Sequence, residues 1–211
     1  MKTLCLSPNA LSGALNLDML PGALQALSLG ANNFTETTTL TSLNPTLRML
    51  YLNRNTFEGS LNFTFPESLE GIYLSENLFS CEIDVSQLPE GLTELGAAHN
   101  RLVGSLCLTS LPQALDYLHL ENNAFHGSLG FTRLPESLES LDLSDNSFSG
   151  EIDVSHLPAE MRELDVRNNK LCGNVHTPPG LVCWVDDTEN NRLFNGNADL
   201  GVLRNRRESA A

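Results

Sequence analysis

An asparagine recurs at a nearly fixed interval along this chain of 211 residues. The eight positions are Asn9, Asn32, Asn55, Asn77, Asn100, Asn123, Asn146 and Asn169. The spacing is constant except for the step from Asn55 to Asn77, which is one position shorter than the others. A period of about 20 to 50 residues is typical of units that cannot bury their own apolar face and must stack on their neighbours. The interval falls within that range and therefore predicts a solenoid.

Each unit surrounds its asparagine with the same apolar pattern. The most complete copy runs from Leu138 to Pro158 and reads Leu-x-x-Leu-x-Leu-x-x-Asn-x-Phe-x-Gly-x-Ile-x-Val-x-x-Leu-Pro. The Leu-x-Leu pair before the asparagine has the alternation of a strand, so Leu141 and Leu143 point inward while Asp142 points outward. We expect one short strand per unit, with the strands stacked in parallel.

The asparagines from Asn32 to Asn169 are interpreted as a structural ladder. An asparagine amide can both donate to and accept from loop backbone that stacking would otherwise bury unpaired. Two residues later every unit has a large apolar side chain, and five of the nine phenylalanines fall there, which predicts an internal stack. Glycine follows four residues after the asparagine in six units, which predicts a positive φ or a close approach there.

The second half of each unit predicts a short extended segment on the back of the coil. Glu82–Ser86 and Glu151–Ser155 both alternate between polar and apolar residues. We expect no helix there. A Leu-Pro pair closes most units, and proline limits strand length because it donates no backbone hydrogen bond.

The segment from Leu138 to Val154 resembles the leucine-rich repeat superfamily, and the resemblance covers about residues 2–185. It implies a right-handed solenoid of the α/β horseshoe class, with a parallel sheet on the concave face, mostly irregular or short extended segments on the convex side, and little helix. The length and pattern of the unit are most similar to leucine-rich repeat proteins of kinetoplastid protists. Plant-type repeats are similar too, but Asp84 and Asp153 stand where their pattern has proline. The resemblance implies protein recognition without enzyme chemistry.

The uninterrupted register sets the expected organisation. Residues 1–173 form an array of eight repeats, of which the first is incomplete, residues 174–185 form a C-terminal cap, and residues 186–211 form a polar, flexible tail. The first repeat begins inside its strand at Thr3, so we expect no preceding cap or signal peptide and favour a cytoplasmic location. The alternative is a fragment of a larger leucine-rich repeat receptor or surface protein with a display role, in which a Cys172–Cys183 disulfide would be meaningful.

The ladder also fixes which side chains leave the sheet on its outward face. All three tyrosines fall on that face, and tyrosine is enriched at binding hot spots. An acidic region that includes Glu121, Asp142 and Asp165 lies beside them. The predicted partner-binding residues are Tyr51, Tyr73, Tyr117, His119, Glu121, Asp142 and Asp165. The alternative is that these side chains only solvate an exposed sheet.

Charge and composition limit the partners. The net charge of −14, from 26 acidic and 12 basic residues, argues against nucleic acid and favours a protein with a basic surface. No apolar run is long enough for membrane insertion. We expect no cofactor and no metal, since two or three stacked carboxylates rarely complete a calcium shell. A hydrolase using the Asp142 and Asp165 pair is a remote alternative, because no nucleophile has a placed base.

Overall fold

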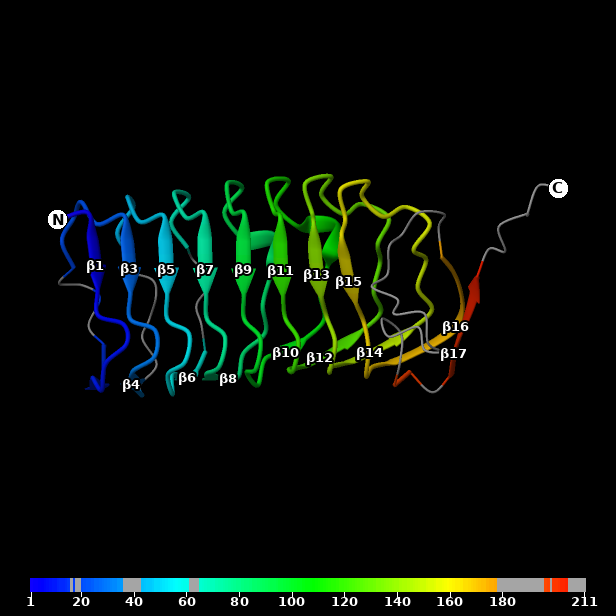
Figure 1. The fold of residues 1–211 in the computed structure, drawn as a ribbon, viewed down its shortest axis with the longest axis horizontal. Coiled ribbons are helices and arrows are strands. Elements are labelled where there is room, and N and C mark those ends of the chain that lie inside the picture. The colour runs from blue at the N-terminus through cyan, green and yellow to red at the C-terminus, as the bar shows by residue number, and fades with distance from the viewer. Residues whose placement is uncertain are drawn as a thin grey trace.

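The computed structural model describes residues 1–15, 17, 20–35, 43–60, 65–177, 196–197 and 199–204. It is a solenoid in which successive coils place one short strand each, side by side, in an eight-stranded parallel sheet (Figure 1). The strands, in sheet order, are β1 (Thr3–Cys5), β3 (Ala26–Ser28), β5 (Met49–Tyr51), β7 (Gly71–Tyr73), β9 (Glu94–Gly96), β11 (Tyr117–His119), β13 (Ser140–Asp142) and β15 (Glu163–Asp165). The predicted leucine-rich repeat solenoid is confirmed.

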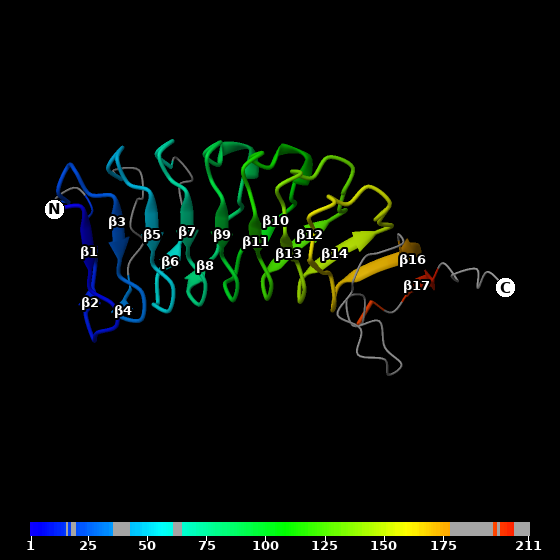
Figure 2. The ribbon, with the colours of Figure 1, turned by 45° about the horizontal axis from the view of Figure 1, so that its top comes forward.

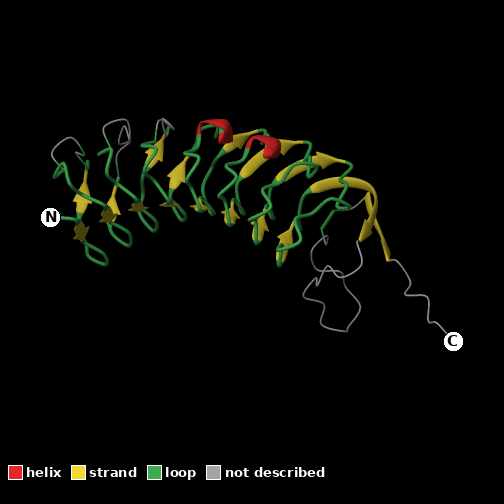
Figure 3. Ribbon diagram, turned by 90° about the horizontal axis from the view of Figure 1, so that it is seen from above, coloured by secondary structure: helices red, strands yellow, loops and turns green. Residues whose placement is uncertain are grey.

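The eight-stranded sheet lines the inner side of an arc, which we call the concave face (Figure 3). Its register aligns equivalent repeat positions, for example Leu118 with Leu95 on one side and Leu141 on the other. The central residue of each of these three strands is buried. The strand phase predicted from the asparagine interval is therefore confirmed.

Shorter strands follow the asparagines on the flank of the coil (Figure 2). β2 (Ser12–Gly13) pairs with β4 (Asn33–Phe34), and β6 (Glu58–Gly59) pairs with β8 (Leu78–Phe79). A five-stranded sheet comprises β10 (Val103–Gly104), β12 (Ala124–Gly127), β14 (Ser147–Gly150), β16 (Lys170–Thr177) and β17 (Asp199–Arg204). Neighbouring coils are thus joined by backbone hydrogen bonds on two sides.

In the described part of the chain, the convex side carries two single-turn 3-10 helices, η2 (Val85–Gln87) and η3 (Leu108–Ser110), on the outside of the arc (Figure 3). The expectation of no helix in Glu82–Ser86 is wrong at its C-terminal end. The Asp84 carboxylate accepts hydrogen bonds from the Ser86 backbone N–H at 3.0 Å and from its hydroxyl at 2.6 Å. This carboxylate thereby supplies an acceptor for a backbone N–H of the first turn.

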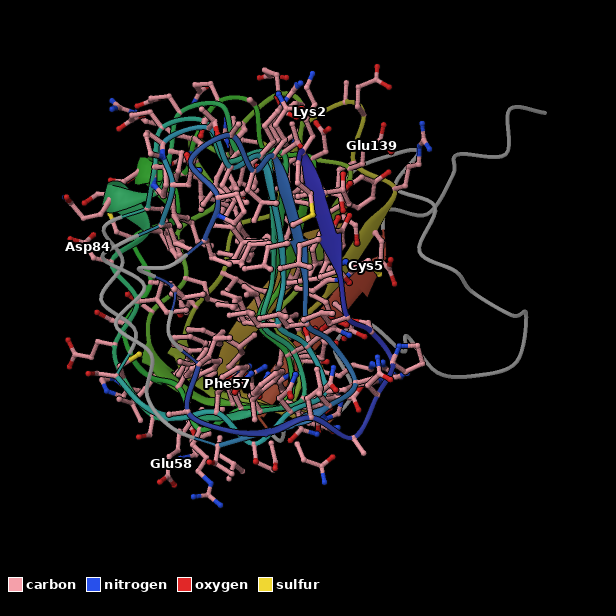
Figure 4. The ribbon with its side chains drawn as sticks, turned by 90° about the vertical axis from the view of Figure 1, so that its left-hand side faces the viewer. Lys2, Cys5, Phe57, Glu58, Asp84 and Glu139 are labelled. Carbon is pink, nitrogen blue, oxygen red and sulfur yellow. The ribbon has the colours of Figure 1, made fainter. Side chains whose placement is uncertain are left out.

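The core is a continuous column of leucines and phenylalanines between the two sides of the coil. Phe57 lies in the interior in the view along the axis (Figure 4) and stacks on Phe34 at 6.0 Å and on Phe79 at 6.1 Å between ring centroids. Phe125 and Phe148 stack in the same way at 6.2 Å. These contacts confirm the predicted phenylalanine stack, which Leu102, also fully buried, interrupts.

Each ladder asparagine joins two consecutive coils. The Oδ1 of Asn77 accepts the Phe57 N–H at 3.1 Å. Its Nδ2 donates to the carbonyl of Leu74 in its own coil at 2.9 Å and to that of Leu52 in the preceding coil at 3.1 Å. Because Asn77 is only 5% exposed, these bonds supply the partners that water cannot reach.

Two positions per coil adopt left-handed backbone. The glycines four residues after the asparagines have φ between 84° and 98°, as predicted. The sequence did not predict a second position, immediately before the asparagine, where non-glycine residues have φ between 51° and 59°. These residues are Ala31, Arg54, Glu76, His99, Asn122, Asp145 and Asn168.

A further asparagine takes the ladder role after Asn169. The Oδ1 of Asn197 accepts the Leu171 N–H at 2.9 Å, and its Nδ2 donates to the Val166 carbonyl at 3.0 Å. Asn197 and β17 lie within residues 186–211, where the sequence suggested a polar tail, and β17 pairs with β16 over six residues. The step from Asn169 to Asn197 is longer than the regular interval, so the spacing of the earlier asparagines does not predict Asn197 as a ladder residue. The Cys183 of the expected disulfide lies outside the described residues.

Candidate functional site

The concave face presents three columns of outward side chains, one from each outward position of the repeat. The middle column is aligned by the sheet register as Cys5, Ser28, Tyr51, Tyr73, Gly96, His119, Asp142 and Asp165. Seen along the axis, Cys5 lies on this face and Asp84 on the opposite side of the coil (Figure 4). The predicted partner-binding residues therefore share one face.

Tyr51 and Tyr73 form a parallel stack at the centre of this face. Their ring centroids are 4.6 Å apart and their planes differ by 6°. The Tyr73 hydroxyl donates a hydrogen bond to the Glu94 carboxylate on the next strand. Burial, followed by this hydrogen bond, raises the pKa of Tyr73 above its ordinary range, so the phenol stays protonated as a donor.

Beyond Tyr73 the column is interrupted by Gly96, and a cavity of about 440 Å³ opens there. It is bordered by Tyr73, Glu94, Tyr117, His119 and Glu121. Gly96 was not among the predicted partner-binding residues, and the sequence did not predict a cavity. A glycine between two large aromatic residues in one column was the signal for it.

On the far side of the cavity, Tyr117 and His119 project from β11. Their rings meet edge to face with centroids 6.5 Å apart and an interplanar angle of 87°. The Tyr117 hydroxyl donates to Glu139 Oε2 at 3.0 Å, and Glu139 also pairs with Arg162 at 3.1 Å. Tyr117 is still 38% exposed, so one ring is available for contact.

His119 is held by a chain of hydrogen bonds. Its Nε2 lies 3.0 Å from Ser140 Oγ, and Ser140 Oγ donates to Glu163 Oε2 at 3.1 Å. Because the single serine proton goes to Glu163, His119 must be the donor in the first bond. A nucleophilic serine instead gives its proton to an imidazole that lies between it and a carboxylate. This chain therefore orients the imidazole and does not activate the serine.

Glu121 is the half-buried carboxylate of the cavity. Its Oε2 atom is shielded from solvent and has no hydrogen-bond partner among the described residues. Burial is the main reason that the pKa of Glu121 is raised, and the nearby Asp142 carboxylate adds to the effect. The cavity thus contains a carboxylate that a positively charged group would stabilise.

The two aspartates of the acidic region differ in their surroundings. Asp142 accepts hydrogen bonds from the Ser144 N–H at 2.9 Å and hydroxyl at 2.7 Å, and burial raises the pKa of Asp142. Asp165 is only 6% exposed and accepts from Arg167 Nε at 2.8 Å and 2.9 Å. The carboxylate of Asp165 is thereby neutralised within the protein, whereas Asp142 is half-buried beside His119.

Among the described residues, no group of three or more His, Cys, Asp or Glu side chains is arranged to hold a metal ion. No helix in the described part of the chain has the length and apolar character that crossing a membrane requires. The concave face presents aromatic rings, hydrogen-bond acceptors and negative charge.

Comparison with known proteins supports the leucine-rich repeat superfamily. Residues 137–156 match the family model described as Leucine Rich Repeat. The Arabidopsis receptor kinase HAESA, solved in complex with the peptide hormone IDA and the co-receptor SERK1, is 24% identical with a TM-score of 0.72, and the match covers 95% of this chain and 38% of that one. No curated protein sequence matches the chain significantly.

Two further solved structures share the fold. PEPR1, solved with AtPEP1, is 22% identical over 97% of this chain and 32% of its own, with a TM-score of 0.70. A plant ice-binding protein is 22% identical over 100% of this chain and 77% of its own, with a TM-score of 0.64. The chain thus spans about a third of the length of the HAESA and PEPR1 chains. At this identity the likeness shows the fold alone.

Proposed function

We propose that this protein is a non-catalytic scaffold that recognises a protein partner through its concave face. The observation that carries the proposal is the cavity between the stacked Tyr51 and Tyr73 and the Tyr117–His119 pair. Aromatic residues in register on a rigid sheet supply contact area at little entropic cost, which is typical of binding hot spots. HAESA is a receptor kinase solved with a peptide hormone and PEPR1 was solved with AtPEP1, and their shared fold supports this class of function.

The charge of the face indicates the kind of partner. Glu94, Glu121 and Asp142 lie around or beside the cavity, and the whole chain has a net charge of −14. Complementary charge steers association and suppresses wrong partners. The proposed partner therefore presents a basic segment. The narrower resemblance to kinetoplastid repeat proteins stays a prediction.

Affinity capture followed by mass spectrometry tests the proposal. Wild type is compared with the double variant Tyr51→Ala/Tyr73→Ala and with His126→Ala, a matched control on β12 whose side chain is exposed on the flank of the coil. We expect the double variant to lose the principal partner and the control to keep it, because truncating a hot-spot aromatic costs about 2 kcal/mol or more of binding free energy. Equal recovery of every partner by all three proteins would contradict recognition by the tyrosines.

A further inference from the structure

Gly96 is not required by the backbone of its strand. Its φ lies outside the left-handed region, unlike that of Gly104 at 98°. A Cβ atom at Gly96 would lie 3.4 Å from Ser75 Oγ and 3.9 Å from Tyr73 Cδ1, which are ordinary contact distances. A larger residue could therefore occupy this position without backbone strain. The absence of a larger side chain at position 96 leaves the cavity open.

The lack of a side chain at Gly96 leaves one face of the Tyr73 ring uncovered. Tyr51 covers one face of the Tyr73 ring at 4.6 Å between centroids. The next residue of the same column, on the other side of Tyr73, is Gly96. The second face of the Tyr73 ring therefore has no stacking partner within its column. A flat group entering the cavity would meet it.

Two carboxylates border the same space from different columns. Glu94 precedes Gly96 by two residues on β9, and Glu121 follows His119 on the next coil. Glu121 Oε2 is shielded and unpartnered. The half-buried Glu121 carboxylate is poorly solvated, so a cation in the cavity interacts with it more strongly than with a fully solvated carboxylate.

We propose that this cavity, which we name the Gly96 pocket, binds an arginine side chain of the partner. This inference rests on the proposed function and specifies one residue of the partner. A guanidinium is planar, so it can stack on the open face of Tyr73 while its N–H groups point to carboxylates on both sides. A lysine ammonium offers a point charge without a stacking plane. The cavity volume of about 440 Å³ accommodates either side chain.

A fragment titration tests the Gly96 pocket without the partner. Nα-acetyl-arginine-N-methylamide is added to the isotope-labelled protein, and amide chemical shifts are followed by NMR. We expect saturable shifts at Gly96, His119 and Glu121, with a dissociation constant on the order of 1 mM for a ligand of this size. The neutral citrulline analogue and the lysine analogue should bind at least several-fold more weakly. Absence of shifts at these amides, or equal binding of either analogue, would overturn the proposal.

Two variants and one control sharpen the result. Gly96→Phe fills the pocket, and Glu121→Gln removes one charge; each should weaken binding about tenfold or more. Ser28→Phe adds the same ring to the same column on the other side of Tyr51 and should bind like wild type. Gly96→Phe should also unfold at an equal or higher denaturant concentration, since glycine destabilises a strand. Undiminished binding by Gly96→Phe would overturn the proposal even if the fragment shifts the expected amides.

The two proposals fail in different experiments. If the fragment does not bind but Tyr51→Ala/Tyr73→Ala loses its partner, the arginine pocket is rejected and concave-face recognition stands. If the fragment binds as expected but the tyrosine variant keeps every partner, the cavity is a guanidinium site, and both its assignment to an arginine of the partner and the tyrosine-centred recognition are rejected.

Discussion

The ring of Tyr51 lies parallel to that of Tyr73, 4.6 Å away between centroids and tilted by only 6°. The pair arises from the register, because the two residues occupy the same position of consecutive coils and face each other across adjacent parallel strands. Parallel strands lie about 4.8 Å apart, which is close to the distance at which aromatic rings stack. The coil spacing thus sets the ring spacing.

This geometry predicts a measurable coupling between the two tyrosines. In a double-mutant cycle of Tyr51→Ala and Tyr73→Ala, the coupling should be about 0.5 to 1.5 kcal/mol in the free energy of unfolding, because each truncation removes the same stack. Urea denaturation followed by circular dichroism measures it. Tyr51 and Tyr117 are separated by two strands and serve as the control, with effects expected to add within about 0.5 kcal/mol. Additive effects in the Tyr51 and Tyr73 cycle would refute a stabilising stack.

The asparagine ladder predicts a large cost for a small truncation. Asn77→Ala removes the acceptor for the Phe57 N–H and the donor to the Leu52 and Leu74 carbonyls, all in buried surroundings. We expect a loss of about 2 to 4 kcal/mol in the free energy of unfolding. Asn174→Ala, at an exposed asparagine, should change it by less than about 0.5 kcal/mol. Similar effects at both positions would show that the ladder hydrogen bonds contribute little.

Much of the scaffold could be predicted because the repeat overdetermines it. Leu141, Leu143 and Asn146 recur in equivalent form in most units, so an error in one unit is corrected by the others. The strand phase, the phenylalanine stack and the positive φ of Gly150 all follow from that repetition. The same reasoning missed Asn197, because its distance from Asn169 in the sequence departs from the regular interval.

The cavity was harder to foresee because it depends on one residue that departs from its column. Gly96 has the expected strand conformation, and only its neighbours Tyr73 and His119 turn a missing side chain into a pocket. Likewise, Asp165 was predicted as a partner-binding residue, but it is only 6% exposed and pairs with Arg167, two residues later in the same coil. Contacts between variable positions cannot be inferred from a pattern that defines the constant ones.

The left-handed residue before each asparagine predicts a stabilising substitution. Ala31 has a φ of 51°, a conformation that costs an ordinary residue about 1 to 2 kcal/mol and that asparagine adopts more readily. Two other coils already have asparagine there, at Asn122 and Asn168. Ala31→Asn should raise the free energy of unfolding by about 1 kcal/mol.

Ala124→Asn is the matched control for this change. Ala124 is exposed on β12 and is not among the residues with positive φ, so asparagine should be neutral or slightly destabilising there. Both variants are compared with wild type by urea denaturation. A gain at residue 124 equal to that at residue 31 would attribute the effect to asparagine itself and not to the backbone conformation.

The half-burial of Glu121 predicts a dependence of stability on pH. Because burial raises the pKa of Glu121 above its ordinary value of 4.5, the folded protein binds this proton more tightly than the unfolded chain. The contribution of Glu121 to stability is therefore fully present below about pH 4.5 and is lost as the pH rises through the folded-state pKa. Glu121→Gln cannot ionise and should escape this loss. Its free energy of unfolding should rise relative to wild type as the pH increases from about 4 to about 8.

Denaturation at several pH values measures this trend, with Glu90→Gln as the control. Glu90 is an exposed carboxylate between η2 and β9 of the same array, so its replacement removes one charge without changing a buried group. The difference between Glu121→Gln and wild type should grow with pH more than the difference between Glu90→Gln and wild type. Equal trends would assign the effect to net charge, because both variants lower the negative charge of the chain by the same amount. A difference that shrinks with pH would reverse the assigned sign and show that ionised Glu121 is stabilised by its surroundings.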